Sequence, residues 1–308
     1  MKQLNSFYLG VLLVFLSAAG FGMIPIFALY AYQGGATVTT LLFFRFTLAA
    51  LCFFAYILLK DRKISVDRPS IKYLLLMGGV IYTLQSNLYF SAVKFIPASL
   101  AVLIFYIYPI FVAIASSLVD KEILTKQILF SIAVSLAGLT LVLGTSFGEI
   151  NIVGTLLALG AGLVYSCYIV LGNRVLKKSP ALVTSAFICL FAAVSNLTIG
   201  LATNTLRFEL TTEAWLAMAG VALVCTVLAI FTFFRGLELI GSTRASILSM
   251  VEPLVTIGFS ALLFQERLTW LQILGGAAVL CGAMLVVSAR EKSKDEKAYQ
   301  AEAKGAGT

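Results

Sequence analysis

The stretch Ser249-Met250-Val251-Glu252-Pro253 places a carboxylate and a proline side by side within an apolar run from about Ala245 to Phe264. A charged side chain near the middle of a membrane helix is costly, and for that reason it marks a functional position by default. Pro253 has no backbone N–H, so it frees a carbonyl in the turn that carries Glu252. A second proline, Pro109, ends the segment Phe105-Tyr106-Ile107-Tyr108-Pro109 and lies 144 residues earlier. Comparing these two segments predicts the architecture.

The composition indicates an all-α, polytopic membrane protein. Of 308 residues, 60% are hydrophobic and 12% are charged, and the mean hydropathy is +1.01. Each apolar run of roughly 20 residues is long enough to cross a hydrocarbon core of about 30 Å as a helix. Ten such runs lie near residues 8–30, 38–59, 71–93, 98–119, 127–147, 152–173, 182–203, 214–237, 244–264 and 268–289. The sequence has no histidine, which excludes histidine-based metal and catalytic motifs, and we expect no metal and no cofactor.

The distribution of basic residues predicts the orientation. With the N-terminus in the cytoplasm, the inside segments hold 18 Lys and Arg and the outside loops hold three, Lys94, Arg207 and Arg267. The positive-inside rule therefore predicts cytoplasmic termini in a cell inner membrane. This bias also accounts for the net charge of +8 without a nucleic-acid partner. We expect membrane lipid to be the partner of the charged tail, residues 291–308, which is predicted to be disordered.

A shift of 144 residues aligns the two halves of the chain. Gly10 then matches Gly154, Pro109 matches Pro253, and Glu122-Ile123-Leu124-Thr125 matches Glu266-Arg267-Leu268-Thr269. Five spans per half is an odd number, so the halves take opposite orientations in the membrane. We therefore predict two inverted five-helix repeats, residues 1–147 and 148–290. Inverted repeats are typical of secondary transporters, whose binding site lies where the repeats meet.

These features resemble the EamA-like family of the drug/metabolite transporter superfamily. The resemblance lies in the ten spans, the duplicated unit, the Glu-x-Leu-Thr motifs and the mid-helix proline of Val251-Glu252-Pro253-Leu254. It implies a secondary transporter, not an enzyme, that moves a small organic solute, an amino acid or a related amphipathic metabolite, by alternating access. The protein would act as a monomer or a homodimer. The alternatives are a membrane-embedded enzyme and a passive channel, but no nucleophile motif, filter loop or charge ring is visible.

Two charged residues within the apolar runs are candidates for function. Glu252 shares a helical face with small polar residues such as Ser249 and Thr256, and it is the candidate for substrate binding and proton coupling. Arg45 lies inside the second run and is a possible ion-pair partner of Glu252 or an anion site. The alternative for Glu252 is a purely structural ion pair. Tyr108 occupies the position that matches Glu252, so no pair of carboxylates is expected.

Aromatic and polar side chains at helical spacing predict the walls of a solute site. Such walls suit an amphipathic solute that binds by stacking, hydrogen bonds and one charge. The alternative is that these aromatics only fill gaps between helices. The predicted substrate-binding residues are Tyr82, Gln85, Tyr89, Phe105, Tyr108, Tyr165, Tyr168, Ser249 and Glu252.

Smaller features predict packing. Ala133 with Ala137, and the matching Ala277 with Cys281, are small residues at a spacing of four and predict close helix contacts. Gly154, Ala158 and Gly162 predict the same for the sixth run. Glu122 and Glu266 precede helices, and each is expected to cap the helix that follows it.

Overall fold

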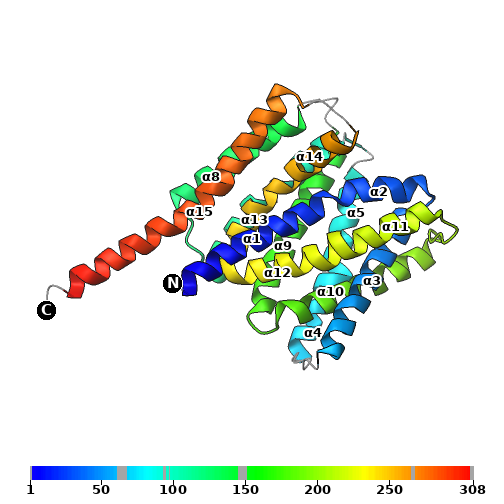
Figure 1. The fold of residues 1–308 in the computed structure, drawn as a ribbon, viewed down its shortest axis with the longest axis horizontal. Coiled ribbons are helices and arrows are strands. Elements are labelled where there is room, and N and C mark those ends of the chain that lie inside the picture. Colours follow the sequence, from blue (N-terminus) through cyan, green and yellow to red (C-terminus); the bar gives the residue numbers. More distant parts are fainter. Residues whose placement is uncertain are drawn as a thin grey trace.

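In the computed structural model, which describes residues 2–60, 68–92, 95–96, 98–144, 151–264 and 268–305, all regular structure is helical. The helices form one elongated bundle, with the N- and C-termini toward the same end (Figure 1). The first-half α-helices are α1 (Lys2–Gly22), α2 (Ile24–Gln33), α3 (Val38–Leu59), α4 (Arg68–Leu75), α5 (Tyr82–Ala92), α6 (Ala98–Phe105), α7 (Tyr108–Asp120) and α8 (Lys126–Leu143). Those of the second half are α9 (Ile152–Leu176), α10 (Ala181–Ala202), α11 (Thr212–Ala222), α12 (Ala229–Ile240), α13 (Ser242–Leu248), α14 (Glu252–Phe264) and α15 (Trp270–Gly305).

Three short non-α segments interrupt these helices. A π-helical segment, η1 (Leu76–Ile81), joins α4 to α5, and another, η2 (Leu223–Leu228), joins α11 to α12. A 3₁₀ segment, η3 (Ser249–Val251), joins α13 to α14. Such interruptions expose backbone carbonyls that regular helix would use, so each needs partners from elsewhere in the bundle.

Helix boundaries repeat at the spacing of 144 residues. The α6–α7 pair, with α6 beginning at Ala98 and α7 spanning Tyr108–Asp120, matches the α13–α14 pair, with α13 beginning at Ser242 and α14 spanning Glu252–Phe264. Likewise α8 begins at Lys126 and α15 at Trp270. The broken helices therefore occupy equivalent places in the two halves. The repeat boundaries at residues 147 and 148 stay a prediction.

The two halves interlock. The first helix of each half packs along the third-run helix of the other half: α1 along α12, and α9 along α5. Helices α3 and α10 pack against one another, as do α8 and α15, and Figure 1 shows α8 and α15 side by side. Every one of these long contacts crosses from one half to the other.

Successive connections alternate between the two ends of the bundle. At one end Gly10 lies against Ile240, Glu122 reaches Ser242, and Asp120 reaches Lys177. We call this the Asp120 end. At the other end Thr211 donates its N–H to the Gly34 carbonyl, and Gly154 lies against Ile96.

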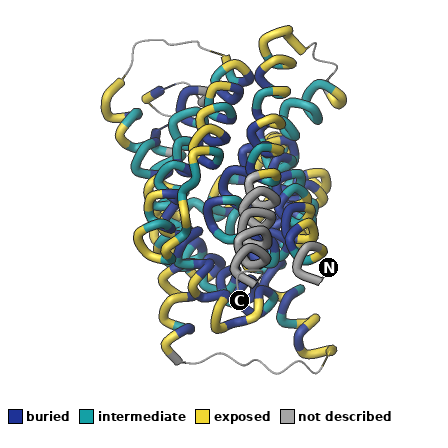
Figure 2. The backbone as a smooth tube through the Cα atoms, turned by 90° about the vertical axis from the view of Figure 1, so that its left-hand side faces the viewer, coloured by how far each residue is buried: buried dark blue, intermediate teal, exposed yellow. Residues whose placement is uncertain are grey.

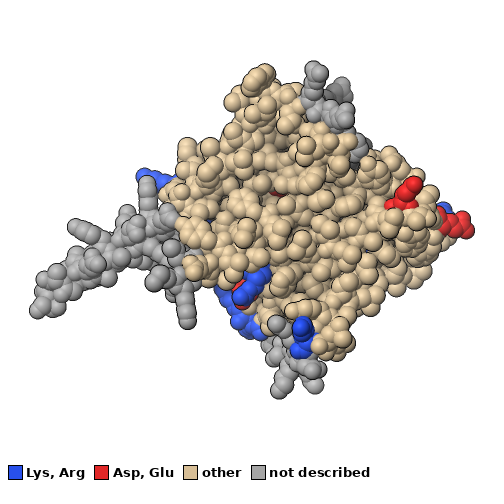
Figure 3. Space-filling view, in the orientation of Figure 1, with Lys and Arg blue, Asp and Glu red and all other residues tan. Residues whose placement is uncertain are grey.

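The outer surface of the bundle is largely apolar. Buried residues concentrate inside the bundle and exposed ones on its outside (Figure 2). On the face in Figure 3, almost all described atoms belong to uncharged residues, and charged side chains lie toward its margins. Among the described residues, nine helices are long and apolar enough to span a membrane. The protein is therefore a multi-pass membrane protein.

The remaining predicted span corresponds to α4, η1 and α5, residues 68–92. It carries Gln85, Ser86 and Asn87 in succession, which lowers its hydropathy. It nevertheless packs along α9, where Met77 contacts Gly172 and Leu88 faces Gly160. Ten spans stay a prediction, of which nine are found by length and composition in the described part of the chain.

The small-residue contact between α8 and α15 differs from the predicted one. Ala133, Ala137, Ala277 and Cys281 were predicted to let a partner helix approach closely, but all four are exposed and do not form the contact between α8 and α15. The close approach uses Gly138 and Gly275 instead. A Cβ on Gly138 would lie 2.6 Å from the Gly275 carbonyl oxygen. Spacing alone did not show which face of α8 and of α15 makes the contact, because small residues occur on both faces of each helix.

The structure continues α15 as helix to Gly305, and the disorder of the charged tail stays a prediction. Between residues 291 and 304 the sequence holds Glu, Lys, Ala, Gln and similar residues without glycine or proline. These residue types favour helix even without tertiary contacts, whereas the prediction of disorder used charge alone.

The Gly275 contact can be tested with a neighbouring residue as the control. We expect Gly275→Ala to lower the free energy of unfolding by about 1–3 kcal/mol relative to Gly276→Ala, because its methyl group would overpack the helix contact. A Cβ at Gly275 would lie 2.8 Å from the Val142 nitrogen, whereas one at Gly276 meets Leu254 at an ordinary 3.6 Å. Both variants gain the same helix propensity, so their difference in detergent unfolding reports the contact. Equal stabilities would contradict it.

Candidate functional site

Each mid-helix proline interrupts its helix, as the sequence predicts. Pro253 cannot donate to the Ser249 carbonyl, and the Glu252 N–H donates to that oxygen instead, closing the 3₁₀ turn of η3. In the first half, Tyr106 and Ile107 form a turn between α6 and α7, just before Pro109. The Phe105 carbonyl that Pro109 leaves free faces α9, where a Cβ on Gly162 would lie 2.9 Å from its oxygen.

Six of the predicted residues meet in one cluster of aromatic rings, which we call the tyrosine cluster. It comprises Tyr82, Tyr89, Phe105, Tyr106, Tyr108, Tyr165 and Tyr168. Tyr165 is its centre, with ring centroids 5.4 Å from Phe105, 4.9 Å from Tyr108 and 5.8 Å from Tyr168. Tyr89 joins through Phe105 at 5.5 Å, and Tyr82 joins through Tyr168 at 6.0 Å.

The tyrosine cluster is assembled from both halves of the chain. Tyr82 and Tyr89 come from α5, and Phe105, Tyr106 and Tyr108 come from the break between α6 and α7. Tyr165 and Tyr168 come from α9 in the second half. Tyr108 and Tyr168 are 2% and 4% exposed, so the cluster lies deep in the bundle. The predicted residues thus meet between the halves.

Glu252 lies at one side of this cluster. Its carboxylate lies within electrostatic range of Tyr89, Tyr106, Tyr108 and Tyr165. The Tyr108 hydroxyl donates to the Ser246 carbonyl at 3.3 Å. Ser249 is buried near Tyr108, and its hydroxyl donates to the Ala245 carbonyl at 2.9 Å. A carboxylate surrounded by phenols can bind a cationic group or exchange a proton.

Arg45 lies on the opposite side of the cluster and is only 4% exposed. Its Nε donates to the Thr226 hydroxyl at 2.7 Å, and its Nη2 donates to the Cys225 carbonyl at 3.4 Å. Its guanidinium also lies 4.8 Å from the ring centroid of Phe46, whose own centroid is 5.2 Å from that of Tyr82. The π-helical segment η2 therefore holds the guanidinium beside the tyrosine cluster.

Arg45 and Glu252 do not form an ion pair. In the described part of the chain, the ion pairs are Asp120–Arg174, Asp120–Lys177 and Arg235–Glu238. The two charges still interact electrostatically across the site. A structural ion pair between them, one of the alternatives from the sequence, therefore does not account for Glu252. The arrangement leaves one cationic and one anionic group on the same cluster.

Gln85 is the predicted residue that the ring contacts do not include. It lies on α5 between Tyr82 and Tyr89, is half-buried, and accepts a hydrogen bond from Ser86 at 3.4 Å. Sequence reasoning missed Tyr106, because counting i and i+3 along a continuous helix ignores the turn before Pro109. It also missed Phe46, since nothing in the sequence indicates that η2 packs on α3.

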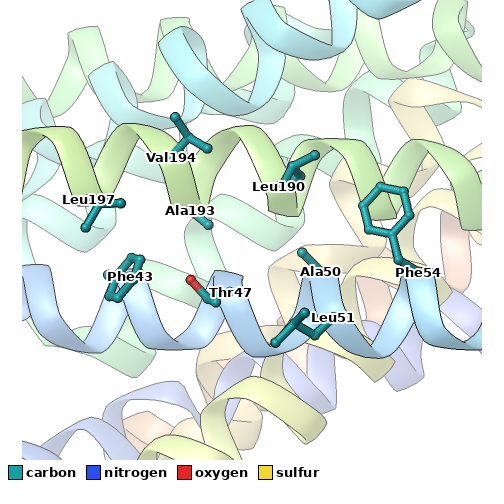
Figure 4. Close-up of a pocket in the computed structure, with 9 residues that line it drawn as sticks. All are labelled: Phe43, Thr47, Ala50, Leu51, Phe54, Leu190, Ala193, Val194 and Leu197. Carbon is teal, nitrogen blue, oxygen red and sulfur yellow. The ribbon is translucent and has the colours of Figure 1, made fainter.

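The grooves detected on the outside of the bundle are not candidates for the site. One, of about 220 Å³, lies between α3 and α10 (Figure 4). Its lining is apolar except for Thr47, and it carries no charged group. Among the described residues, no group of three Cys, Asp or Glu side chains could hold a metal ion.

The fold and the buried site define a polytopic membrane protein with polar and charged groups at the contact between its halves. The profile of the EamA-like transporter family matches residues 8–144 and again residues 152–288. The chain therefore belongs to the EamA-like transporter family, and it is a transporter and not an enzyme.

Individual relatives agree with this assignment. An uncharacterized transporter of Archaeoglobus fulgidus is 30% identical over 88% of this chain and 94% of its own length. The uncharacterized transporter YcbK of Bacillus subtilis is 24% identical over 90% of this chain and 91% of its own length. A probable amino-acid metabolite efflux pump of Escherichia coli is 27% identical over 72% of this chain and 79% of its own length.

A solved crystal structure shares the fold. It superposes with a TM-score of 0.80 over 92% of this chain and 98% of that chain, at 20% sequence identity. The helical arrangement described above is therefore one that an experimentally determined structure also adopts.

The anchoring of Arg45 can be tested at Thr226. Thr226→Val removes the acceptor of the Arg45 Nε–H while keeping the side-chain shape, and we expect it to lower the free energy of unfolding by about 1 kcal/mol. Thr232→Val is the matched control, because the Thr232 hydroxyl donates only within α12 and η2, to Leu228 and Ala229. Thermal unfolding in detergent measures both. An equal loss in the two variants would mean that Thr226 does not anchor Arg45.

Proposed function

We propose that this protein is a secondary transporter that binds a small organic solute at the tyrosine cluster and moves it by alternating access. The observation that carries this proposal is the meeting of aromatic rings, Glu252 and Arg45 between the two halves. In transporters built from inverted repeats, the solute binds near the middle of the membrane where the repeats meet. Movement of one half past the other would then expose this site to each side in turn.

The chemistry of the site favours an amphipathic solute with charged groups. Aromatic rings bind apolar and cationic parts of a ligand, while hydroxyls and one carboxylate fix its orientation. The Escherichia coli relative is named as a probable amino-acid metabolite efflux pump. Amino acids and related metabolites are therefore the first solutes to test.

The basic residues support an orientation with the Asp120 end in the cytoplasm. The connections and termini at this end carry most of the Lys and Arg of the chain, as a cytoplasmic side requires. We infer a cell inner membrane, cytoplasmic termini and contact with anionic lipid for the basic tail. The short connections at residues 95–98 and 239–242 each lead into a broken helix, and we propose that they let each helix pair move as a unit.

Glu252 is the proposed proton carrier. We expect Glu252→Gln still to exchange labelled solute across vesicles but to lose accumulation driven by a pH gradient, because glutamine has a similar shape and hydrogen bonding and cannot release a proton. The measurement compares counterflow with gradient-driven uptake in proteoliposomes. A panel of labelled amino acids first identifies the solute with the wild-type protein.

Glu238→Gln is the matched control for this variant, because Glu238 lies at the surface and pairs with Arg235 of the same helix. It should keep both activities. Wild-type accumulation by Glu252→Gln would contradict proton coupling at this residue. Absence of saturable uptake of the whole panel by the wild-type protein would contradict the proposed solute class.

Tyr165 tests the position of the solute site. Tyr165→Leu removes the central ring, and we expect it to raise the KM for solute about tenfold, on the scale of one lost aromatic contact. Tyr165→Phe keeps the ring and should stay near the wild type. Tyr73→Leu on the exposed face of α4 is the control, since Tyr73 is 49% exposed. Unchanged KM in Tyr165→Leu would place the solute elsewhere.

A further inference from the structure

Three helix ends that belong to different parts of the bundle meet at the Asp120 end. Helix α7 ends at Asp120, α9 ends at Leu176, and α13 begins at Ser242. Helix α7 is in the first half, whereas α9 and α13 are in the second. Opening of the solute site toward this end would require these ends to separate. Two carboxylates hold them together.

The first carboxylate is Asp120, which binds the end of α9. It accepts a hydrogen bond from Lys177 Nζ at 2.8 Å and one from Asn173 Nδ2 at 3.2 Å, and Arg174 Nε lies 3.5 Å away. The Asp120 side chain is only 6% exposed, although Arg174 and Lys177 reach solvent. Arg174 Nη2 also donates to the Val119 carbonyl at 2.8 Å. The last turn of α7 is thus fixed to the end of α9 by four polar contacts.

The second carboxylate is Glu122, which binds the start of α13. Lys121 ends α7 with a φ of 56°, and the Glu122 N–H returns to the Ser116 carbonyl at 3.2 Å, so the chain folds back on itself. The Glu122 carboxylate accepts the Ser242 N–H at 3.1 Å and the Thr243 N–H at 3.3 Å, together with the Thr243 hydroxyl. Glu122 therefore caps α13 of the other half. The prediction that it caps its own following helix was wrong, because Thr125 caps α8.

The positions that match Asp120, Arg174 and Lys177 in the other repeat carry no charge. A shift of 144 places Phe264 at the position of Asp120, and Tyr30 and Gln33 at the positions of Arg174 and Lys177. Glu266, the counterpart of Glu122, lies outside the described residues. The repeats share their helix boundaries, but the Asp120 contact to α9 has no charged equivalent between α14 and the first-half helices α1 and α2. The difference makes the two ends of the bundle unequal.

We propose that Asp120 and Glu122 form a two-part latch that keeps the Asp120 end closed when no solute is bound. This inference rests on the proposed alternating access. Helix α7 cannot move away from α9 or α13 until the Asp120 and Glu122 contacts break. The latch therefore favours the state in which the solute site opens toward the opposite end.

Distances between spin labels test the latch without any solute. Labels at Ile123→Cys, which follows the latch, and Lys178→Cys, just beyond α9, are both on exposed positions. The background lacks the five native cysteines, Cys52, Cys167, Cys189, Cys225 and Cys281. We expect the parent protein in liposomes to show mainly a short distance. In Asp120→Asn combined with Glu122→Gln, the ratio of long- to short-distance populations should rise at least about tenfold, as for the loss of one charge-assisted hydrogen bond.

Two further variants secure the interpretation. Arg174→Gln combined with Lys177→Gln removes the cations from the other side and should give a shift in the same direction, even where the carboxylate variant fails to fold. Glu238→Gln is the control, because its ion pair with Arg235 lies within α12 and joins no two helices. Its distances should match those of the parent.

Unchanged distances in both latch variants, with folded and monodisperse protein, would overturn the latch. That result would leave the proposed transport intact wherever the wild-type protein still takes up solute. Conversely, a population shift in a protein that transports none of the tested solutes would retain the latch and reject the proposed substrates.

Discussion

This structure depends on one constraint: each backbone carbonyl that a helix break leaves unpaired needs a hydrogen-bond partner, because the bundle interior has no bulk water. Each unsatisfied polar group in a hydrocarbon environment costs several kcal/mol, on the order of a lost hydrogen bond or more. The chain nevertheless interrupts its spans at Pro25, Pro109 and Pro253 and with two π-helical segments. In the π-helical segments it supplies partners across the halves: Ser195 donates to the Gly79 carbonyl in η1, and Arg45 donates to the Cys225 carbonyl in η2. The interruptions therefore tie the two halves together.

This constraint also explains why the charged residues lie where they do. Arg45 is tolerated in the interior because η2 offers it a carbonyl and a hydroxyl, and because the Phe46 ring lies beside its guanidinium. Glu252 lies among phenol side chains, and Tyr89, Tyr106 and Tyr108 are within electrostatic range of its carboxylate. Neither charge is neutralised by the other. Two separated charges beside aromatic rings can bind the two ends of one ligand, which a direct ion pair would prevent.

Much of the fold follows from the sequence, because hydropathy, helix length and the 144-residue repeat are properties of the chain alone. The two mid-helix prolines predicted a loosened turn with a freed carbonyl, and the structure has a turn or a 3₁₀ segment just before each of them. Positions that share a face on α5 and α9 brought Tyr82, Tyr165 and Tyr168 into ring contact, while Tyr89 contacts Phe105. Tyr106 was missed because the turn before Pro109 changes which residues share a face. The partner of Glu122 was missed because a cap on a helix 120 positions away leaves no local pattern.

The interlocking of the halves has a consequence for how the protein is made. Helix α5 leaves the ribosome long before α9, against which it packs, and α1 precedes its neighbour α12 by an even longer stretch of chain. Domains ordinarily fold in the order of synthesis, the N-terminal one first. Here the helices of the first half, α1 to α8, lack their main packing partners when they enter the membrane, because those partners belong to the second half. Their assembly has to wait for translation of the second half, so the two halves mature together as one folding unit.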